Sequence, residues 1–196
     1  MIIYLHGFRS SPRSEKAQAL LKTMEAQGLS SELWCEQLPP DPAEAIGLIE
    51  TAIQNASTSP LLVGSSLGGY YATHLSEKHQ LKAVLINPAA YAYRILAPHL
   101  GFHQNLYTGQ SFELTQGHIE TLKHLEVEPI KYPKHFWLLA ETGDEVLDYR
   151  EAVHKYRGGK QTILTGGDHS LTRFPDYIDA IIACSKDGYS DFEVEQ

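Results

Sequence analysis

The chain has 196 residues, of which 42% are hydrophobic and 20% are charged, and its formal net charge is −8. This length predicts one globular domain with a sizeable core, and the acidic balance argues against a nucleic-acid partner, which needs clustered Lys and Arg. No apolar run approaches the roughly 20 residues that span a bilayer, and no signal peptide is expected from the N-terminal residues. We therefore expect a cytoplasmic protein with two incidental thiols, Cys35 and Cys184.

Short apolar runs alternate with amphipathic stretches along the chain. Six runs predict buried strands, at 2–5, 31–38, 60–64, 82–87, 135–140 and 161–165. Helical spacing or helix-start residues predict helices at 17–24, after 41–42, from 67 to 78, around 148–157 and after 175. This alternation predicts an α/β fold with a mostly parallel sheet of about six strands and helices on both faces. In such sheets ligands bind beyond the carboxyl ends of the strands.

The loop after the first predicted strand reads His6-Gly7-Phe8. In this topology that turn supplies one backbone donor of an oxyanion hole, the N–H of Phe8, beside the N–H of Leu67. We expect His6 itself to have a structural hydrogen-bonding role. Arg9, the next residue, either meets an acidic group of a substrate or is solvated or paired locally.

The loop after the third predicted strand reads "GSSLG", a G-x-S-x-G pattern between a strand and a helix. The serine of this pattern sits on a strained turn, where side chains two residues away on either side would collide. Gly64 and Gly68 therefore assign the nucleophile to Ser66, because Ser65 has Val63 and Leu67 at those positions. Taken alone, the pentapeptide is equally compatible with a Gly/Ser turn that does no chemistry.

Acidic residues follow the fifth predicted strand, and a histidine follows the sixth. The order Ser66, Asp144, His169 is the order of a Ser-acid-His triad in α/β-hydrolases. His169 would act as general base, and Asp144 would orient its ring. Three further carboxylates lie within reach on paper: Asp148, expected to cap the following helix, and Glu145 and Asp168, which could assist the triad. This chemistry requires no metal and no organic cofactor.

Several segments, in this order, resemble the small bacterial YqiA-type esterases of the α/β-hydrolase superfamily: "YLHGFRSSPRSEKA", "QLPP", "VGSSLGGYYAT", "INPA", "LYTGQ", "TGDEVLDYR" and "GGDHS". The resemblance runs from about residue 2 to about residue 183. It implies an α/β-hydrolase fold without a large cap domain and an intracellular carboxylic-ester or acyl-thioester hydrolase. It also places the nucleophile on Ser66, the acid on Asp144 and the base on His169. The chain departs from the family pattern at Asp168, where Asn is common.

We thus predict a single α/β-hydrolase domain over 1–185 and a mobile C-terminal tail over 186–196. The predicted function is hydrolysis of small-molecule carboxylic esters through an acyl-enzyme, with no nucleic-acid or membrane partner. An acyl-CoA thioesterase, which uses the same triad, and a non-catalytic binding protein on the same fold stay open as alternatives. The fold alone does not choose the substrate.

The segment 88–134 is too long for a bare loop in a compact domain. Its aromatic residues include Tyr91, Tyr93, Phe102, Tyr107 and Phe112, which either line an acyl pocket or belong to helices that pack on the sheet. His99 and His103 have i, i+4 spacing on a possible helix, but no third ligand follows at a useful spacing, so no metal site is predicted.

Overall fold

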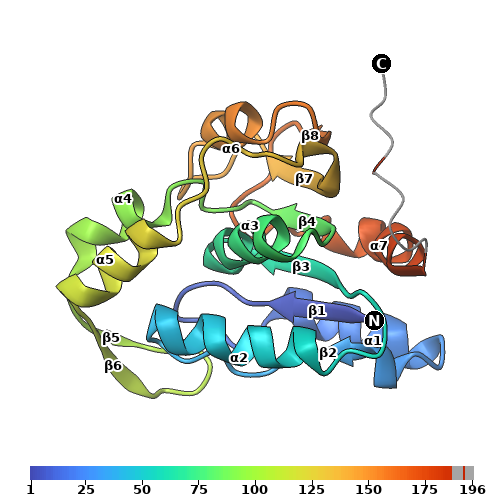
Figure 1. Ribbon diagram of the computed structural model, residues 1–196, viewed down its shortest axis with the longest axis horizontal. Helices are drawn as coiled ribbons and strands as arrows, with labels where there is room; N and C mark the ends of the chain where they lie inside the picture. Colours follow the sequence, from blue (N-terminus) through green and yellow to red (C-terminus); the bar gives the residue numbers. More distant parts are fainter. Residues whose placement is uncertain (187–191, 193–196) are drawn as a thin grey trace.

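The protein is described by a computed structural model, which covers residues 1–186 and 192 (Figure 1). The predicted tail at 186–196 lies outside the described residues, apart from Lys186 and Phe192. In chain order the strands and helices are β1 (Ile2–Leu5), α1 (Glu15–Ala26), β2 (Leu33–Trp34), α2 (Pro42–Gln54), β3 (Leu61–Ser65), α3 (Leu67–His79), β4 (Ala83–Ile86), α4 (Ala92–Leu96), β5 (Gly101–Gln104), β6 (Ser111–Leu114), α5 (Gln116–His124), β7 (Phe136–Glu141), α6 (Tyr149–Lys155), β8 (Lys160–Leu164) and α7 (Ile178–Lys186).

Six parallel strands form the main sheet in the order β2-β1-β3-β4-β7-β8. This confirms the predicted fold class, and within residues 1–186 no large cap covers the sheet. The predicted strand at 31–38 is wrong in extent, since only Leu33 and Trp34 pair with β1. The chain leaves the sheet edge there because the backbone N–H of Leu38 donates instead to Nε2 of His6, at 3.0 Å.

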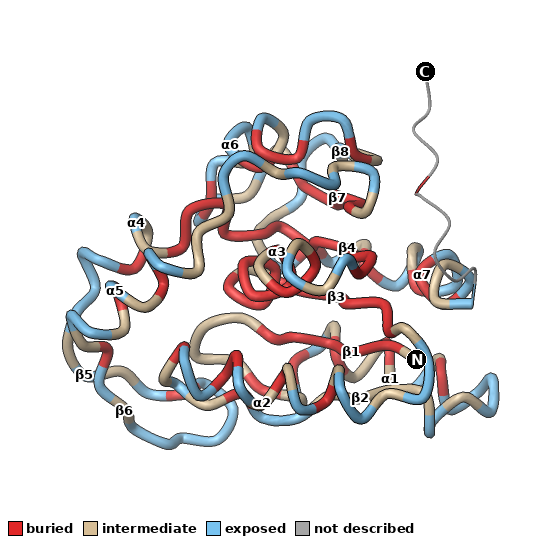
Figure 2. The backbone as a smooth tube through the Cα atoms, viewed as in Figure 1, coloured by how far each residue is buried: buried red, intermediate tan, exposed pale blue. Residues whose placement is uncertain are grey.

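Strand residues alternate between two apolar cores, one on each face of the sheet. One core joins Ile3, Leu5, Leu62, Leu85 and Leu138 to α2, α3 and α6. The other joins Ile2, Tyr4, Val63, Val84 and Leu139 to α1 and α7. The buried tube of Figure 2 follows these central strands and α3. Both faces of the sheet are therefore covered, and functional groups are accessible at the strand ends.

The segment between β4 and β7 folds as α4, α5 and an antiparallel hairpin of β5 and β6. Figure 1 shows these elements gathered at one end of the molecule. The hairpin contacts the loop after β1: the N–H of Leu106 donates to the carbonyl of Arg9, and Nδ2 of Asn105 donates to that of Ser10. The hairpin thus lies beside the carboxyl end of β1, and α4 and α5 are the two helices of the same segment.

Among the described residues, no helix is both long enough and apolar enough to cross a bilayer.

Candidate active site

Ser66 lies on the turn that joins β3 to α3. Its φ is 54°, in the left-handed region that residues with a side chain rarely adopt. A Cβ atom at Gly64 would lie 2.3 Å from the carbonyl oxygen of Gly68, and a Cβ atom at Gly68 would lie 2.0 Å from that of Leu5. Only residues without a side chain let this turn close against itself and against β1, so the two glycines hold Ser66 in its strained conformation.

Two consecutive hydrogen bonds join Ser66, His169 and Asp144. The hydroxyl of Ser66 donates to Nε2 of His169 at 3.2 Å, and Nδ1 of that ring donates to Oδ2 of Asp144 at 2.8 Å. The residues follow β3, β8 and β7, whose carboxyl ends meet at one edge of the parallel sheet. The structure therefore brings together the three side chains that the sequence predicts as nucleophile, base and acid.

Asp144 is held as an ionised hydrogen-bond acceptor. Burial opposes its ionisation, but hydrogen bonds from His169, Leu147 and Val146 outweigh this effect, so the pKa of Asp144 lies below its ordinary value. The N–H groups of Leu147 and Val146 both donate to Oδ1, at 2.8 and 2.9 Å. An ionised carboxylate at Nδ1 favours the tautomer in which Nε2 of His169 accepts a proton.

The other three candidate carboxylates take different positions. Glu145 accepts a hydrogen bond from the backbone N–H of His169 at 3.0 Å, so it supports the backbone and not the ring. Asp148 caps α6 and pairs with the exposed Arg150, which confirms its predicted capping role. Oδ1 of Asp168 is buried and has no hydrogen-bond partner among the described residues. Of the four, Asp144 is the one that reaches the imidazole.

Glu141, a residue not predicted as functional, anchors the loop that carries His169. This carboxylate is fully buried at the end of β7. Oε2 accepts the N–H of Asp168 at 2.7 Å, and Oε1 accepts Nε of Arg173 at 2.7 Å. A Cβ atom at Gly167 would lie 2.0 Å from Oε2, so this glycine makes room for the carboxylate. The sequence does contain a signal for this anchoring role. Glu141 is a charged residue at the end of an apolar strand, and two glycines, Gly166 and Gly167, come just before His169.

Asn87, directly after β4, is a second anchor that the sequence analysis did not single out. Nδ2 donates to the carbonyls of Asp168 and His169, at 3.0 and 3.1 Å, and Oδ1 accepts the N–H of Glu141. Asn87 and Glu141 therefore bind the histidine loop from two adjacent strands. The side chains of Asn87 and Glu141 are buried, so losing a partner in the histidine loop would leave a buried polar group unsatisfied.

The predicted oxyanion donors lie on the two segments that pass Ser66. A Cβ atom at Gly7 would lie 3.1 Å from Cβ of Ser66, so the loop before Phe8 runs directly against the serine. Leu67 is the first residue of α3, where backbone N–H groups have no acceptor within the helix. Across the described part of the chain, neither the N–H of Phe8 nor that of Leu67 donates to a protein acceptor. Both are available to a ligand atom beside Ser66.

Two cavities flank the turn of Gly7 and Phe8. One, of about 310 Å³, contains Ser66 and His169 and has polar groups in its walls, which include Ser10, Ser14, Glu15, Lys16, Tyr107 and Ser170. The other, of about 260 Å³, is bounded by Leu67 and by side chains that include Leu38, Pro39, Pro40, Tyr71 and Phe112. Phe8 lines both. A bound molecule at Ser66 thus has a polar side and a more apolar side available to it.

Of the aromatic residues singled out in 88–134, Phe112 lines the apolar cavity and Tyr107 lines the cavity that contains Ser66. Tyr91 is buried in the core, Tyr93 contacts Arg94, and Phe102 is 83% exposed. The interpretation as core packing therefore holds for Tyr91, whereas an acyl pocket lined by Phe112 or Tyr107 stays a prediction.

The predicted helical spacing of His99 and His103 is wrong. His99 ends a short 3-10 turn and His103 lies on β5, because the chain turns into the hairpin between them. Nε2 of His103 donates a hydrogen bond to the carbonyl of His99. In the described residues, no group of three or more His, Cys, Asp or Glu side chains could hold a metal ion.

Lys16 and Arg9 each line one of the two cavities beside Ser66. Nζ of Lys16 donates to the carbonyl of Ser170 at 2.5 Å, and burial lowers the pKa of this ammonium group. Nε of Arg9 donates to the carbonyl of Gln104 on the hairpin, and Arg9 also borders the apolar cavity. His6 at the same loop accepts the N–H of Leu38, which is the structural role expected for it.

Several solved structures of α/β-hydrolases share this fold. Mouse alpha/beta hydrolase domain-containing protein 10 matches with a TM-score of 0.66 at 17% identity, over 93% of this chain and 88% of that one. Est1E from Butyrivibrio proteoclasticus, in a structure with bound ferulic acid, matches with a TM-score of 0.65 at 13% identity, over 93% and 86%. Carboxylesterase CesB (YbfK) from Bacillus subtilis matches with a TM-score of 0.56 at 16% identity, over 94% and 82%.

A family model also matches residues 1–186, which is nearly the whole chain. Its description reads "Uncharacterised protein family (UPF0227)". The solved structures are too distant in sequence to show more than the fold, whereas the family match covers the fold and every residue of the site. The chain therefore belongs to the YqiA-like family UPF0227, which confirms the resemblance stated from its motifs.

Proposed function

We propose that this protein is a serine esterase that hydrolyses carboxylic esters of small molecules. The observation that carries the proposal is the hydrogen-bonded series from Ser66 through His169 to Asp144. Solved structures of the same fold include a carboxylesterase and an esterase with bound ferulic acid, which supports ester chemistry.

In the proposed mechanism, Nε2 of His169 takes the proton of Ser66 as its oxygen attacks the ester carbonyl. Asp144 stabilises the imidazolium that forms. The backbone N–H groups of Phe8 and Leu67 bind the oxyanion, and one such donor is typically worth about 2.7–4 kcal/mol. His169 then returns the proton to the leaving alcohol, and the acyl group stays on Ser66. In the second half of the reaction His169 takes a proton from water, which attacks this acyl-enzyme, and then returns the proton to the oxygen of Ser66 as the carboxylic acid is released.

The two cavities fit opposite parts of an ester. The leaving group receives its proton from His169, so it departs on the side of the cavity that contains His169. The acyl group is then directed past Leu67 into the apolar cavity. This assignment follows from the mechanism and places polar alcohols on the side of Lys16.

Labelling with a fluorophosphonate probe tests the proposal. We expect the probe to attach to Ser66, and we expect Ser66→Ala to abolish both labelling and hydrolysis of p-nitrophenyl butyrate. Ser65→Ala is the matched control, because Ser65 ends β3 next to the nucleophile and should keep both. No labelling of the unmodified protein would favour a non-catalytic binding protein, and labelling at Ser65 would refute the assignment of the nucleophile.

A comparison of leaving groups separates an esterase from a thioesterase. The same acyl group is presented as an ethyl ester and as a coenzyme A thioester. An esterase should show the higher kcat/KM on the ester, and a preference for the coenzyme A thioester would assign the protein to the thioesterases instead.

A further inference from the structure

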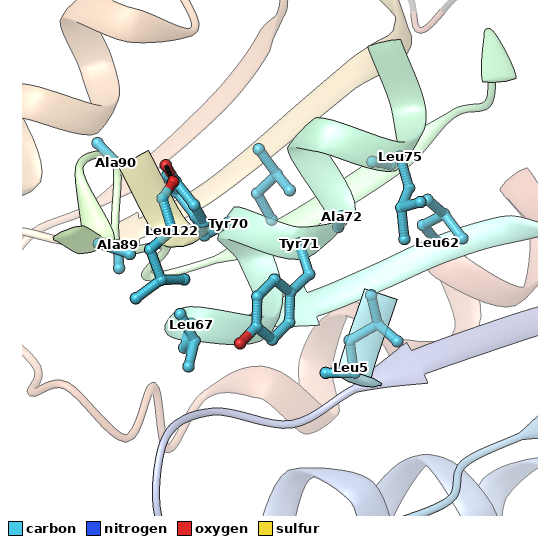
Figure 3. Packing of buried hydrophobic residues seen from close by; sticks show 14 of the residues in the cluster. Leu5, Leu62, Leu67, Tyr70, Tyr71, Ala72, Leu75, Ala89, Ala90 and Leu122 are labelled. Atoms are coloured by element: carbon cyan, nitrogen blue, oxygen red, sulfur yellow. Dashed lines mark hydrogen bonds between the residues drawn. The ribbon is translucent and has the colours of Figure 1, made fainter. Parts of the chain in front are cut away.

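Tyr71 is a buried side chain whose polar atom faces the apolar cavity. The residue is only 2% exposed and its side chain lines the cavity next to Leu67. Its hydroxyl makes no hydrogen bond with any residue that the structure describes, and it is not fully enclosed by protein atoms, so it reaches the open space of the cavity. Figure 3 shows the ring extending from α3 with the hydroxyl on the side of Leu67.

Two neighbouring tyrosines differ from Tyr71 in this respect. The hydroxyl of Tyr70, on the same helix, donates to the carbonyl of Leu122 at 2.6 Å, and the hydroxyl of Tyr156 is hydrogen-bonded to Oγ1 of Thr73 at 2.8 Å. Buried phenol hydroxyls generally find a partner, because an unsatisfied one costs free energy. The hydroxyl of Tyr71 reaches the cavity instead, so its partner comes from outside the chain: water, or an oxygen atom of a bound molecule.

The other buried polar side chains on this cavity are already occupied. Nε2 of His6 accepts the N–H of Leu38. Asn105 donates to the carbonyl of Ser10 and accepts the N–H of Tyr107. Tyr71 is thus the buried wall residue with hydrogen-bonding capacity to spare.

Tyr71 lies four residues after Leu67 on α3, so the two side chains share one face of the helix. Burial raises the pKa of the phenol, so the hydroxyl stays protonated and can donate as well as accept. The carbonyl of a bound ester would lie beside Leu67. The part of the acyl chain that follows this carbonyl would therefore lie near the hydroxyl of Tyr71. The wall also includes the apolar side chains of Leu38, Phe8 and Phe112 and the exposed polar side chains of Gln37 and Gln110.

We propose that Tyr71 is a specificity-determining residue that hydrogen-bonds an oxygen atom of the acyl group, so that the preferred substrates are esters of small carboxylic acids bearing a hydroxyl or keto group. This inference rests on the proposed ester hydrolysis. A site built to bond such an oxygen discriminates against the analogue that lacks it, because its own polar group is then left unpaired.

Matched ester pairs test the inference. The p-nitrophenyl esters of butyrate and β-hydroxybutyrate form one pair, and those of phenylpropanoate and its para-hydroxylated analogue form another. For each pair we compare kcat/KM in the unmodified protein and in Tyr71→Phe, which removes only the hydroxyl. We expect the unmodified protein to prefer the oxygenated ester of at least one pair by about tenfold or more, and Tyr71→Phe to bring that ratio close to one.

Tyr70→Phe is the matched control. It loses its hydrogen bond to Leu122, so it should lower the unfolding temperature while leaving the ester ratios unchanged. Tyr71→Phe, which loses no such bond, should not lower the unfolding temperature. A change in the ratio confined to Tyr71→Phe therefore cannot arise from general loss of stability.

The outcomes separate the two proposals. If neither ester of either pair is hydrolysed by the unmodified protein, the proposed function fails and this inference falls with it. If the esters are hydrolysed but Tyr71→Phe leaves both ratios as they were, the proposed function stands and the role of Tyr71 is overturned.

Discussion

The buried carboxylate of Glu141 accepts the backbone N–H of Asp168 at 2.7 Å, one residue before His169. The loop that carries the imidazole is thereby tied to the end of β7, the strand that also leads to Asp144. The distance between imidazole and carboxylate is therefore set by neighbouring backbone segments, and the catalytic geometry depends on a residue that touches neither the ring nor Ser66.

Glu141→Gln tests this dependence. The amide keeps the shape of the side chain but loses the charged partner of Arg173 and one acceptor, so the loop should be held less firmly. We expect kcat to fall while KM stays nearly unchanged, and the free energy of unfolding to fall by about 1–3 kcal/mol. Ester kinetics and urea unfolding measure the two effects.

The matched control for this change is Asp148→Asn. Asp148 also carries an ion pair with an arginine, but this pair is exposed, and the hydrogen bonds of Asp148 go to Arg150 and not to the imidazole. Exposed pairs contribute about 1 kcal/mol or less, so kcat should not change. An unaltered kcat in Glu141→Gln as well would show that Glu141 is not needed to position His169.

The amide variants of the other carboxylates test the assignment of the triad acid. Asp144→Asn should cost the most activity, because it removes the ionised partner of Nδ1, a change worth about 10⁴ in kcat in a serine protease. Glu145→Gln and Asp168→Asn should cost less, since Glu145 supports only the backbone of His169. The measurement is kcat on p-nitrophenyl butyrate, with folding checked by circular dichroism.

The positions of these residues could be predicted because they depend on local pattern. Buried parallel strands are continuous apolar runs, and their carboxyl ends share one edge of the sheet, so the loops after β3, β7 and β8 had to converge. The turn at Ser66 could be predicted from Gly64 and Gly68, because it has no room for side chains at these two positions. These features were enough to predict the fold class and the proximity of Ser66, Asp144 and His169.

Other features depend on contacts that no local pattern records. Glu141 and Asn87 read as ordinary strand-end residues until β4, β7 and the histidine loop are packed together. The β5–β6 hairpin is short and partly exposed, and it is held by the loop after β1 rather than by its own periodicity. The hydroxyl of Tyr71 likewise could not be singled out from the sequence. Tyr70 and Tyr71 are adjacent there, and only the folded protein shows which of the two hydroxyls has a partner within the chain.

A pair of glycine variants tests the steric argument for the turn at Ser66. Gly68→Ala should destabilise the protein strongly, because the new Cβ atom would lie 2.0 Å from the backbone oxygen of Leu5. Gly47→Ala, in the exposed middle of α2, meets nothing within 4 Å. It should instead raise the free energy of unfolding by about 0.5–1 kcal/mol through helix propensity. Urea unfolding of both variants gives the comparison, and equal effects would contradict the close approach of β1.

Buried His6 and partly buried His74 predict how stability changes with pH. Burial lowers the pKa of His6 and of His74, against weaker opposing effects of hydrogen bonds to the carbonyls of Gly7 and Leu125. In the unfolded chain an imidazole titrates near about 6.5, so below that pH the unfolded state binds more protons than the folded state. The stability that comes from keeping these rings neutral is therefore complete above about pH 6.5 and is lost as the pH falls through their lowered pKa values.

His6→Gln isolates one of these contributions. The amide oxygen of Gln can still accept the N–H of Leu38, but it does not titrate. The variant should therefore be somewhat less stable than the unmodified protein at about pH 7.5 and should lose less stability between that pH and about pH 5. The urea midpoint measured at both pH values gives the slope, and the same substitution at the exposed His99 serves as control. A slope unchanged by His6→Gln would mean that protonation of His6 does not oppose folding, and the role of its ring as a neutral acceptor for Leu38 would have to be abandoned.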